Sequence, residues 1–255
     1  MSRRLSVDLL PGLHVPGHRS GTALVIDVLR ATTTATTFLE RGADAVVFAP
    51  SIAAAHDLRG TLGTGALLAG ERGGIRIDGF DLGNSPLDAS AREWTGHTLV
   101  MNTTNGTGAA HLAAGHSDRV LLACLRNAPA AAAQALAGGG DVSVVCAGTD
   151  GQVSLDDCYA AGVLVRELTA QAGQGDFLLN DAAQMVLALL DRWPDPLAAL
   201  QASAHGQRLL QMGDTDLAFA DLALDVAFCA ELGVSDHVPE LRGRNAQGLV
   251  FGLPD

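Results

Sequence analysis

Apolar segments alternate with segments of helical character along roughly the first two thirds of the chain. The clearest strand covers residues 22–31, TALVIDVLRA, which are apolar and rich in β-branched side chains. Further strands are predicted over residues 43–50, 66–74, 118–127 and 141–151, and residues 97–115 read as a strand, a polar loop and a helix. The other helices are predicted over residues 32–42, 51–60, 85–96, 128–140 and 154–171. This alternation predicts an α/β fold with a largely parallel or mixed sheet.

The pattern changes after about residue 176 and becomes helical. Three helices are predicted, over residues 177–193, 196–213 and 221–233, and the tail 237–253 is predicted to form one or two edge strands. The chain reads as a single unit, 1–255, which could divide into two α/β subdomains at about 1–140 and 141–255.

Composition narrows the classes of partner. The net charge is −12 and the chain contains no lysine, so a nucleic-acid partner is not expected. None of the four cysteines forms a CxxC pair, which favours a reducing, cytoplasmic location. The first 18 residues lack the features of a signal peptide, and no apolar stretch is long enough for a membrane helix.

A charged, glycine-rich ribbon, GERGGIRIDGFDLGNSP over residues 70–86, follows one predicted strand. Its glycines allow the backbone to approach a bound anion closely, so the ribbon is predicted to be an active-site wall. A flexible surface loop is the alternative. Asn84 and Ser85 are expected to hold the turn and cap the next helix.

Polar side chains follow four predicted strands, and ligands bind at the carboxyl ends of strands in parallel α/β sheets. Arg30 and Arg72 offer forked donors for phosphate or carboxylate groups. The loop Thr103–Thr107, with Thr104, Asn105 and Gly106, offers hydroxyls and backbone N–H groups at a helix N-terminus. Hard oxygen ligands suited to Mg²⁺ are supplied by Asp27, Glu71, Asp81, Asp150, Asp156 and Asp157.

Taken together, these groups indicate metal-assisted phosphoryl chemistry, but each has a plainer interpretation. Asp27 could cap the following helix, and Arg30 could pair with a neighbouring acid. Asn105-Gly106 could be an ordinary turn. Asp156 and Asp157 could favour the dipole of their helix. Among the histidines, His205 and His237 are better candidates than the rest, although a helix-face position explains them as well.

The same segments resemble a known family. VIDVLRATTT, LLAGERGG with GFDLGNSP, NTTNGT and VVCAGTDGQVSLDD, followed by SAHGQRLLQMG and DVAFCAELGVSDHVPEL, are similar to the 2-phosphosulfolactate phosphatases, or ComB proteins, over about residues 20–242. The chain departs from the family where Asn102 stands in place of the usual threonine. It also departs in the segment from Asp214 to Cys229, which is longer than the usual link and puts the C-terminal packing or subunit contacts in question.

The resemblance implies a layered α/β/α fold and a Mg²⁺-dependent acid phosphatase. Such an enzyme hydrolyses (2R)-2-phospho-3-sulfolactate to 3-sulfolactate and phosphate, a reaction of coenzyme M biosynthesis. We therefore expect catalytic roles for Asp27, Arg30, Glu71 and Asp150, and Mg²⁺ binding by Asp27, Glu71, Asp81, Asp156 and Asp157. Substrate binding is expected from Arg72, Asn84, Thr103, Thr104, Asn105, Gly106 and Thr107.

The nucleophile stays open between Asp27 and a water molecule, with water favoured because Asp27 lacks the DxD pattern of haloacid-dehalogenase phosphatases. Alternatives for the function are a phosphatase of another small phosphorylated 2-hydroxy acid, a phosphotransferase or lyase acting on a similar acid, and a non-catalytic protein that binds anionic metabolites. The apolar surface expected of the C-terminal helices favours a homodimer.

Overall fold

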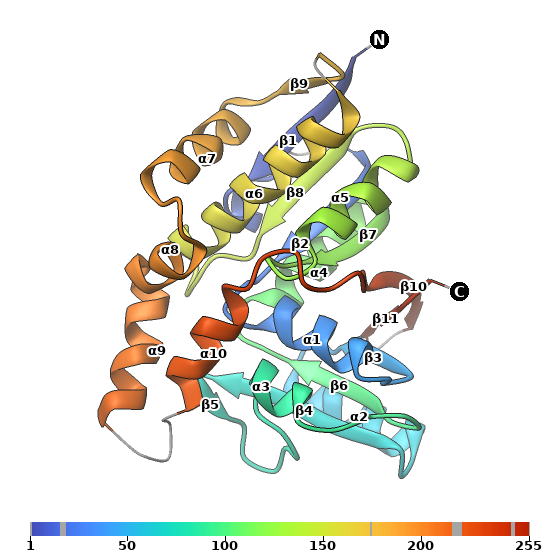
Figure 1. Ribbon diagram of the computed structural model, residues 1–255. Coiled ribbons are helices and arrows are strands. Elements are labelled where there is room, and N and C mark those ends of the chain that lie inside the picture. Colours follow the sequence, from blue (N-terminus) through green and yellow to red (C-terminus); the bar gives the residue numbers. More distant parts are fainter. Residues whose placement is uncertain (1, 16–18, 174, 216–220, 246–247, 255) are drawn as a thin grey trace.

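The computed structural model describes residues 2–15, 19–173, 175–215, 221–245 and 248–254 (Figure 1). Within them, eleven strands form a sheet of order β5-β4-β6-β3-β11-β10-β7-β2-β8-β1-β9. The strands are β1 (Arg3–Asp8), β2 (Ser20–Ile26), β3 (Ala45–Phe48), β4 (Ala66–Arg72), β5 (Ile75–Arg76), β6 (Thr98–Asn102), β7 (Ser117–Ala123), β8 (Val142–Cys146), β9 (Phe177–Leu179), β10 (Glu240–Asn245) and β11 (Gly248–Gly252).

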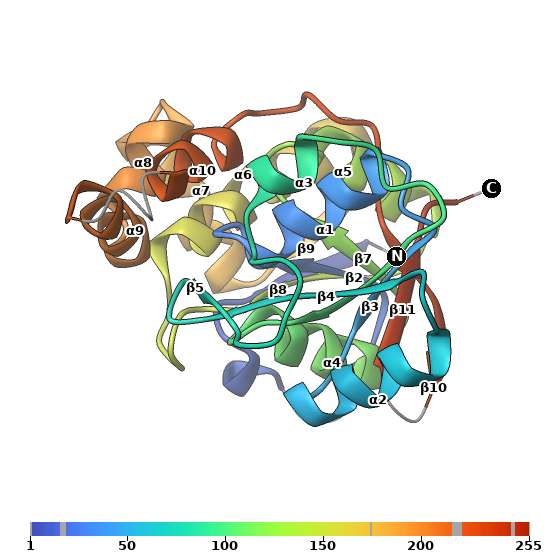
Figure 2. The same cartoon turned by 90° about the horizontal axis from the view of Figure 1, so that it is seen from below.

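The helices cover both faces of this sheet. Figure 2 shows α2 and α4 on one face and α1, α3, α5 and α6 on the other, which confirms the α/β fold with a mixed sheet. The helices are η1 (Pro11–Leu13), α1 (Ala31–Glu40), α2 (Ile52–Leu62), α3 (Pro86–Ser90), α4 (Gly106–His116), α5 (Ala128–Ala137), α6 (Leu155–Ala172), α7 (Asp181–Arg192), α8 (Pro196–Ala202), α9 (Ala204–Thr215) and α10 (Asp221–Cys229).

The sheet consists of two parallel sets joined by an antiparallel hairpin. Strands β4, β6 and β3 run parallel to one another, as do β7, β2, β8, β1 and β9. The hairpin β10–β11 pairs with β7 on one side and β3 on the other. The prediction of edge strands for the tail is therefore wrong. The reason is burial, because Leu249 and Phe251 of β11 are almost fully enclosed, as expected of a central strand.

Two further predictions need correction. Residues 177–179 form β9 rather than the start of a helix. The helix that follows, α7, begins after Asn180, whose side chain accepts a hydrogen bond from the Ala183 amide and so acts as its cap. The predicted helix 196–213 is two helices, α8 and α9, which meet at Ser203.

The core depends on small side chains because aromatic residues are few. One face of α5 carries Ala128, Ala131, Ala132 and Ala135, all fully buried. Without large side chains at this face, the helix can approach the sheet closely. The division into subdomains at about residue 140 stays a prediction. Of the long segment from Asp214 to Cys229, residues 216–220 lie outside the described residues.

Other features bear on surface and chemistry. In the described part of the chain, no helix combines the length and apolar character needed to cross a bilayer. Cys124, Cys146, Cys158 and Cys229 are all buried and free of disulfides.

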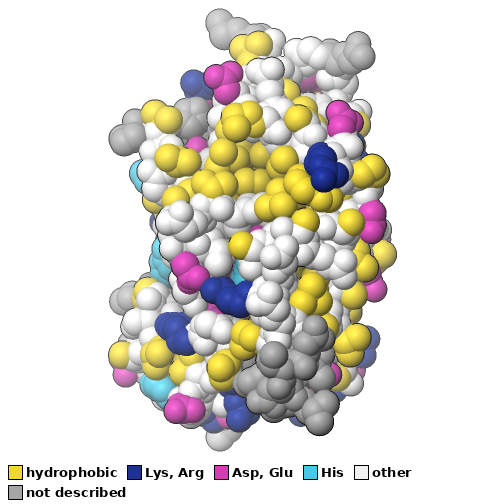
Figure 3. Space-filling model, turned by 90° about the vertical axis from the view of Figure 1, so that its left-hand side faces the viewer, with side chains coloured by type: hydrophobic (Ala, Val, Ile, Leu, Met, Phe, Trp, Pro, Cys, Tyr) yellow, Lys and Arg dark blue, Asp and Glu magenta, His cyan; other side chains and the backbone are white. Residues whose placement is uncertain are grey.

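On the side of the molecule turned toward the viewer in Figure 3, hydrophobic side chains gather in a band. Leu178 of β9 and Met185 of α7 are among the exposed large hydrophobic residues. The homodimer stays a prediction.

Candidate active site

A polar pocket lies where the predicted strand-end segments meet. Its lining comes from the loops after β2, β4, β6 and β8, from the start of α3 and from α9. The lining residues are Asp27, Leu29, Arg30, Glu71, Gly73, Gly74, Asn84, Thr104, Asn105, Asp150, His205 and Arg208. The structure thus brings most of the predicted site residues to one place, including parts of the glycine-rich ribbon.

Asp27 directly follows β2 and is almost fully buried beside the start of α1. Its Oδ1 accepts a hydrogen bond from the Ala31 amide, 3.1 Å away, so Asp27 satisfies the first amide of α1 and also lines the pocket, while Arg30 occupies the N-cap position. Burial raises the pKa of Asp27 from 3.8 to about 6, although the Ala31 amide and His205 lower it. A carboxyl group with such a pKa can exchange a proton near neutral pH.

Glu71 lies one residue before the end of β4 and joins this strand to the loop after β6. Its Oε1 accepts hydrogen bonds from the amide and the hydroxyl of Thr104, both at 2.9 Å. Its Oε2 accepts one from the Gly74 amide at 2.8 Å. Glu71 therefore fixes the ribbon and the predicted phosphate cradle relative to each other, while its carboxylate still lines the pocket.

The cradle itself is the N-terminus of α4. Gly106, its first residue, packs against Asp27, and a β carbon there would come within 2.7 Å of the Asp27 carboxylate. Asn105 lines the pocket, and its side chain accepts a hydrogen bond from the Asp150 amide. Thr103 and Thr107 are buried and do not line the pocket, and the Thr107 hydroxyl donates to the Thr103 carbonyl.

Asp150 and Arg208 close the solvent side of the pocket. Arg208 Nη1 lies 2.9 Å from Asp150 Oδ2, and both side chains are substantially exposed. Asp150 adopts a φ of 52°, a left-handed conformation that aspartate tolerates better than most residues. Because an exposed ion pair contributes little free energy, substrate anions can compete for Arg208.

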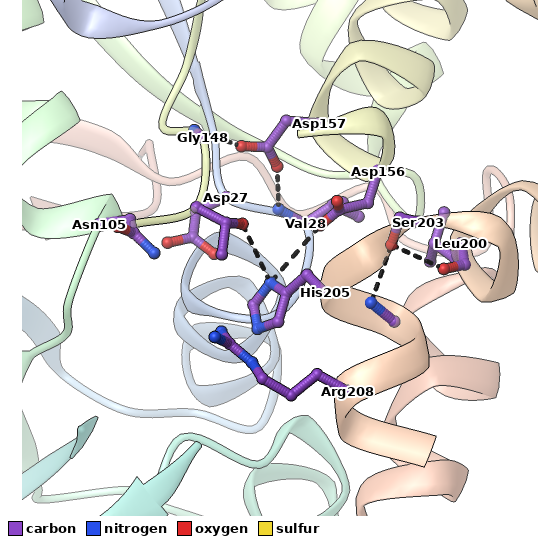
Figure 4. Close-up of polar contacts among 12 residues, drawn as sticks. Asp27, Val28, Asn105, Gly148, Asp156, Asp157, Leu200, Ser203, His205 and Arg208 are labelled. Atoms are coloured by element: carbon purple, nitrogen blue, oxygen red, sulfur yellow. Dashed lines mark hydrogen bonds and ion pairs between the residues drawn. The ribbon is translucent and has the colours of Figure 1, made fainter. Parts of the chain in front are cut away.

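A cluster of buried acids lies behind the pocket. Asp157 accepts hydrogen bonds at 2.9 Å from the amides of Val28 and Gly148, which ties together the loops after β2 and β8 (Figure 4). Asp156 faces His205, with 3.8 Å between Asp156 Oδ2 and His205 Nδ1. Burial, together with the charges of Asp156 and Asp27, raises the pKa of Asp157 well above its usual range.

His205 and Arg208 lie near the start of α9 because of a tight junction with α8. The Ser203 hydroxyl accepts from the Gly206 amide and donates to the Leu200 carbonyl, both at 2.8 Å. A β carbon at Gly206 would overlap the Leu200 carbonyl, so the glycine is required for the close approach. The junction turns His205 into the pocket, where its Nδ1 lies 3.3 Å from the Thr149 hydroxyl.

Arg30 lines the pocket from a buried position. Its Nη1 lies 2.5 Å from Asp225 Oδ2, and its Nη2 donates to the Gly74 carbonyl at 3.1 Å. Arg30 therefore does pair with an acid, but inside the protein rather than on a solvated face.

Two predicted residues lie elsewhere. Arg72 turns back onto β6, where it donates to the Asn102 side chain and to the Glu71 carbonyl, and it does not line the pocket. Asp81 pairs with Arg59 at 3.1 Å and accepts from the Leu68 amide at 2.9 Å. It lines a neighbouring depression that also contains Arg30 and Asn84.

The oxygen donors fit a cation held by few protein ligands. Asn84 Oδ1 and Asp156 Oδ1 are buried, and among the described residues neither has a hydrogen-bond partner. Nowhere in the described ranges do three or more His, Cys, Asp or Glu side chains form a group arranged to hold a metal. Mg²⁺ is commonly bound through one or two carboxylates together with waters and substrate oxygens, and Asp27 with Asn84 can supply such a site.

Sequence reasoning gave no role to Arg208 or Asp225, although both lie within the segments that carry the family resemblance. The sequence favours His205 and His237 over the other histidines, and of these two only His205 lines the pocket. The signal available was the sequence SAHGQR, in which a serine cap and a glycine place a histidine and an arginine one helical turn apart.

Comparisons with known proteins agree with this geometry. The model of the 2-phosphosulpholactate phosphatase family matches residues 9–244. A probable 2-phosphosulfolactate phosphatase of Deinococcus radiodurans is 48% identical over 239 residues, which cover 93% of each chain. One of Thermus thermophilus is 44% identical over 250 residues, covering 97% of this chain and 98% of the relative. One of Carboxydothermus hydrogenoformans is 41% identical over 218 residues, covering 85% and 84%.

The match therefore spans nearly the whole chain, including every segment that lines the pocket, and the chain belongs to the 2-phosphosulpholactate phosphatase family.

Proposed function

We propose that this protein is a Mg²⁺-dependent phosphatase that hydrolyses 2-phospho-3-sulfolactate to 3-sulfolactate and phosphate, as in coenzyme M biosynthesis. The observation that carries the proposal is the convergence of Asp27, Arg30 and Asn105 with His205 and Arg208 in a single polar pocket. Family membership and the names of the relatives support the same reaction.

The charge of the pocket supports a requirement for a divalent cation. Its lining contains three carboxylates, Asp27, Glu71 and Asp150, but only two arginines, Arg30 and Arg208. Such a surface would repel a substrate that carries phosphate, carboxylate and sulfonate groups together. When bound, Mg²⁺ would offset that repulsion and the charge that develops on the phosphate oxygens.

The candidate Mg²⁺ ligands are chosen by their position in or beside the pocket and by the hydrogen bonds that their oxygens already make. Asp27 is the ligand of first choice because it is a buried carboxylic acid that lines the pocket, and Asn84, which lines the same pocket, can supply a neutral oxygen. Asp156, whose Oδ1 has no partner among the described residues, completes the set through water. Glu71 and Asp157 are weaker candidates, because backbone amides already occupy both oxygens of each carboxylate. Asp81 stays a more distant candidate because Arg59 neutralises it.

The remaining residues bind and orient the substrate. Arg30 and the N-terminus of α4, with Thr104 and Asn105, hold the phosphate, while Arg208 holds an acid group of the substrate. A water molecule attacks phosphorus, and a carboxylate of the pocket that does not hold the metal accepts its proton. The bond between phosphorus and the C2 oxygen breaks, this oxygen takes a proton, and His205 lies in the pocket as a candidate for its donor.

The proposal is tested by the initial rate of phosphate release from 2-phospho-3-sulfolactate with Mg²⁺ and with EDTA. We expect turnover only with the metal, and p-nitrophenyl phosphate should be hydrolysed more slowly under the same conditions. Binding of phosphosulfolactate without release of phosphate would contradict the proposal and favour an anion-binding protein.

A panel of phosphorylated 2-hydroxy acids tests the substrate assignment separately. The highest kcat/KM is expected for phosphosulfolactate, because its third anionic group adds an interaction with Arg208. Higher kcat/KM values for an acid without the sulfonate would assign the site to another member of this substrate class.

A further inference from the structure

A single buried carboxylate ties three parts of the site together. Asp225 lies on α10 and is fully enclosed. Its Oδ2 contacts Arg30 Nη1, while its Oδ1 accepts from the Ser85 hydroxyl at 2.7 Å and from the Leu87 amide at 3.3 Å. The C-terminal helix thereby contacts both the loop after β2 and the start of α3.

Arg30 depends on this contact for its orientation. Its side chain is 4% exposed, and among the described residues its guanidinium donates hydrogen bonds to Asp225 and to the Gly74 carbonyl. Arginine carries five N–H donors in a planar fork, so donors remain for a bound anion. Arg30 lines the pocket, so its remaining donors can face a bound anion. Asp225, which binds Nη1, fixes the direction in which those donors point.

A buried ion pair of this kind contributes orientation more than stability. Burial raises the pKa of Asp225, and Arg30 opposes that effect. Removing one member would leave the other charge buried without its partner, which is unfavourable. A long arginine side chain without a fixed partner would also have to lose conformational freedom each time it bound a phosphate.

We propose that Asp225 is a positioning residue for the reaction: it holds Arg30 with its free donors turned toward the phosphate, and it locks the ribbon end at Ser85 beside Arg30. The inference rests on the proposed function, because it assigns Arg30 to the phosphate of the substrate. It gives the C-terminal helix a role in catalysis even though Asp225 touches no substrate atom.

The chain offers a matched control in a second ion pair. Arg119 and Glu240 form two hydrogen bonds at 2.8 and 3.0 Å and join β7 to β10. Neither residue lines the pocket. A loss of this pair affects stability alone, so comparison of the two pairs separates positioning from folding.

The test compares Asp225→Asn, Asp225→Glu and Glu240→Gln in the full-length protein. Asp225→Asn keeps an acceptor for Ser85 but presents no charge to Arg30. We expect it to raise KM for phosphosulfolactate and Kd for inorganic phosphate in Mg²⁺ by at least tenfold. Asp225→Glu should recover part of that loss, and Glu240→Gln should lower Tm while leaving KM and phosphate Kd within twofold of the wild type.

A double-mutant cycle with Arg30→Lys should be strongly non-additive, because either substitution alone disturbs the same contact. The inference is overturned if Asp225→Asn lowers Tm, as Glu240→Gln does, but leaves phosphate Kd unchanged. Should Asp225→Asn not fold, Ser85→Ala replaces it: a two- to threefold rise in phosphate Kd supports the inference, and no change overturns it. Wild-type protein that releases no phosphate would instead remove the proposed function, and this inference with it.

Discussion

Gly106 lies against the carboxylate of Asp27, with so little space between them that a β carbon at position 106 would approach Asp27 Oδ2 to 2.7 Å and the Ala31 β carbon to 2.8 Å. The N-terminus of α4, the proposed phosphate cradle, is thus in direct contact with Asp27, the proposed principal acid of the site. The close approach explains the glycine, because no other residue lets α4 begin at this point.

Gly106→Ala should therefore displace the start of α4 and impair catalysis without unfolding the protein. A shift of a few tenths of an ångström to 1 Å at the cradle lowers kcat by about ten- to a hundredfold. The measurement is kcat for phosphosulfolactate together with the far-UV circular dichroism spectrum.

Gly108 provides the control in the same helix, since a β carbon there would meet no atom within 4 Å. Gly108→Ala should leave kcat unchanged and stabilise the protein by about 0.5–1 kcal/mol. Equal kcat values for the two alanine variants would show that the contact between Gly106 and Asp27 has no catalytic importance.

How far the sequence predicts this structure depends on the range of each interaction. Apolar runs and caps are local. A strand is therefore confirmed within residues 22–31, although β2 ends at Ile26 and Ala31 already begins α1. The cap at Ser51 is also confirmed, since its hydroxyl accepts from the Ala54 amide. The place of the hairpin β10–β11 is not local, because it depends on which strands leave a gap for it. Nothing in residues 240–252 specifies β3 and β7 as its neighbours.

The residues of the candidate site also fall into those that local sequence patterns predict and those that depend on long-range packing. Glu71 lies at the end of a strand, and Asp27, Asn105 and Asp150 follow strands. Strand ends in α/β folds are where ligands bind, so the convergence of these residues could be predicted. The pairing of Arg30 with Asp225 joins residues 195 positions apart through helix packing, which no local pattern encodes. Arg72, the other predicted forked donor, turns away because the Asn102 side chain offers it a nearer partner.

The free energy of unfolding should depend on pH through the titration of the Asp27 carboxyl. Since its folded-state pKa of about 6 lies above the ordinary 3.8, its contribution to stability is fully present below pH 3.8 and is lost as the pH rises through about 6. The loss amounts to about 3 kcal/mol. Asp27→Asn removes the buried charge, so it should be more stable than the wild type at pH 7.5 in EDTA and equal to it near pH 4.

Melting curves at several pH values check this expectation. Added Mg²⁺ should raise the Tm of the wild type at pH 7.5 but not that of Asp27→Asn, because the metal binds the carboxylate. A Tm difference between the two proteins that is the same at every pH would rule out the proposed titration of Asp27.

Arg208 should contribute to substrate binding and little to stability. Its partner Asp150 is 57% exposed, so the pair adds at most about 1 kcal/mol to the folded state. Arg208→Gln should raise KM for phosphosulfolactate by about tenfold or more, which corresponds to the loss of one charge-assisted hydrogen bond, with Tm almost unchanged.

The matched control is Arg19→Gln, which breaks a similarly exposed pair with Asp118. Arg19 does not line the pocket, so KM should stay at the wild-type value. If both variants change KM equally, the effect reflects the overall charge of the protein rather than a contact with the substrate.

The most direct test of the central claim is a crystal structure with Mn²⁺ in place of Mg²⁺ and with inorganic phosphate, in which anomalous scattering locates the metal. We expect Mn²⁺ between Asp27 and the phosphate, and the phosphate in contact with Arg30 and the N-terminus of α4. Metal or phosphate bound only outside this pocket would contradict the account.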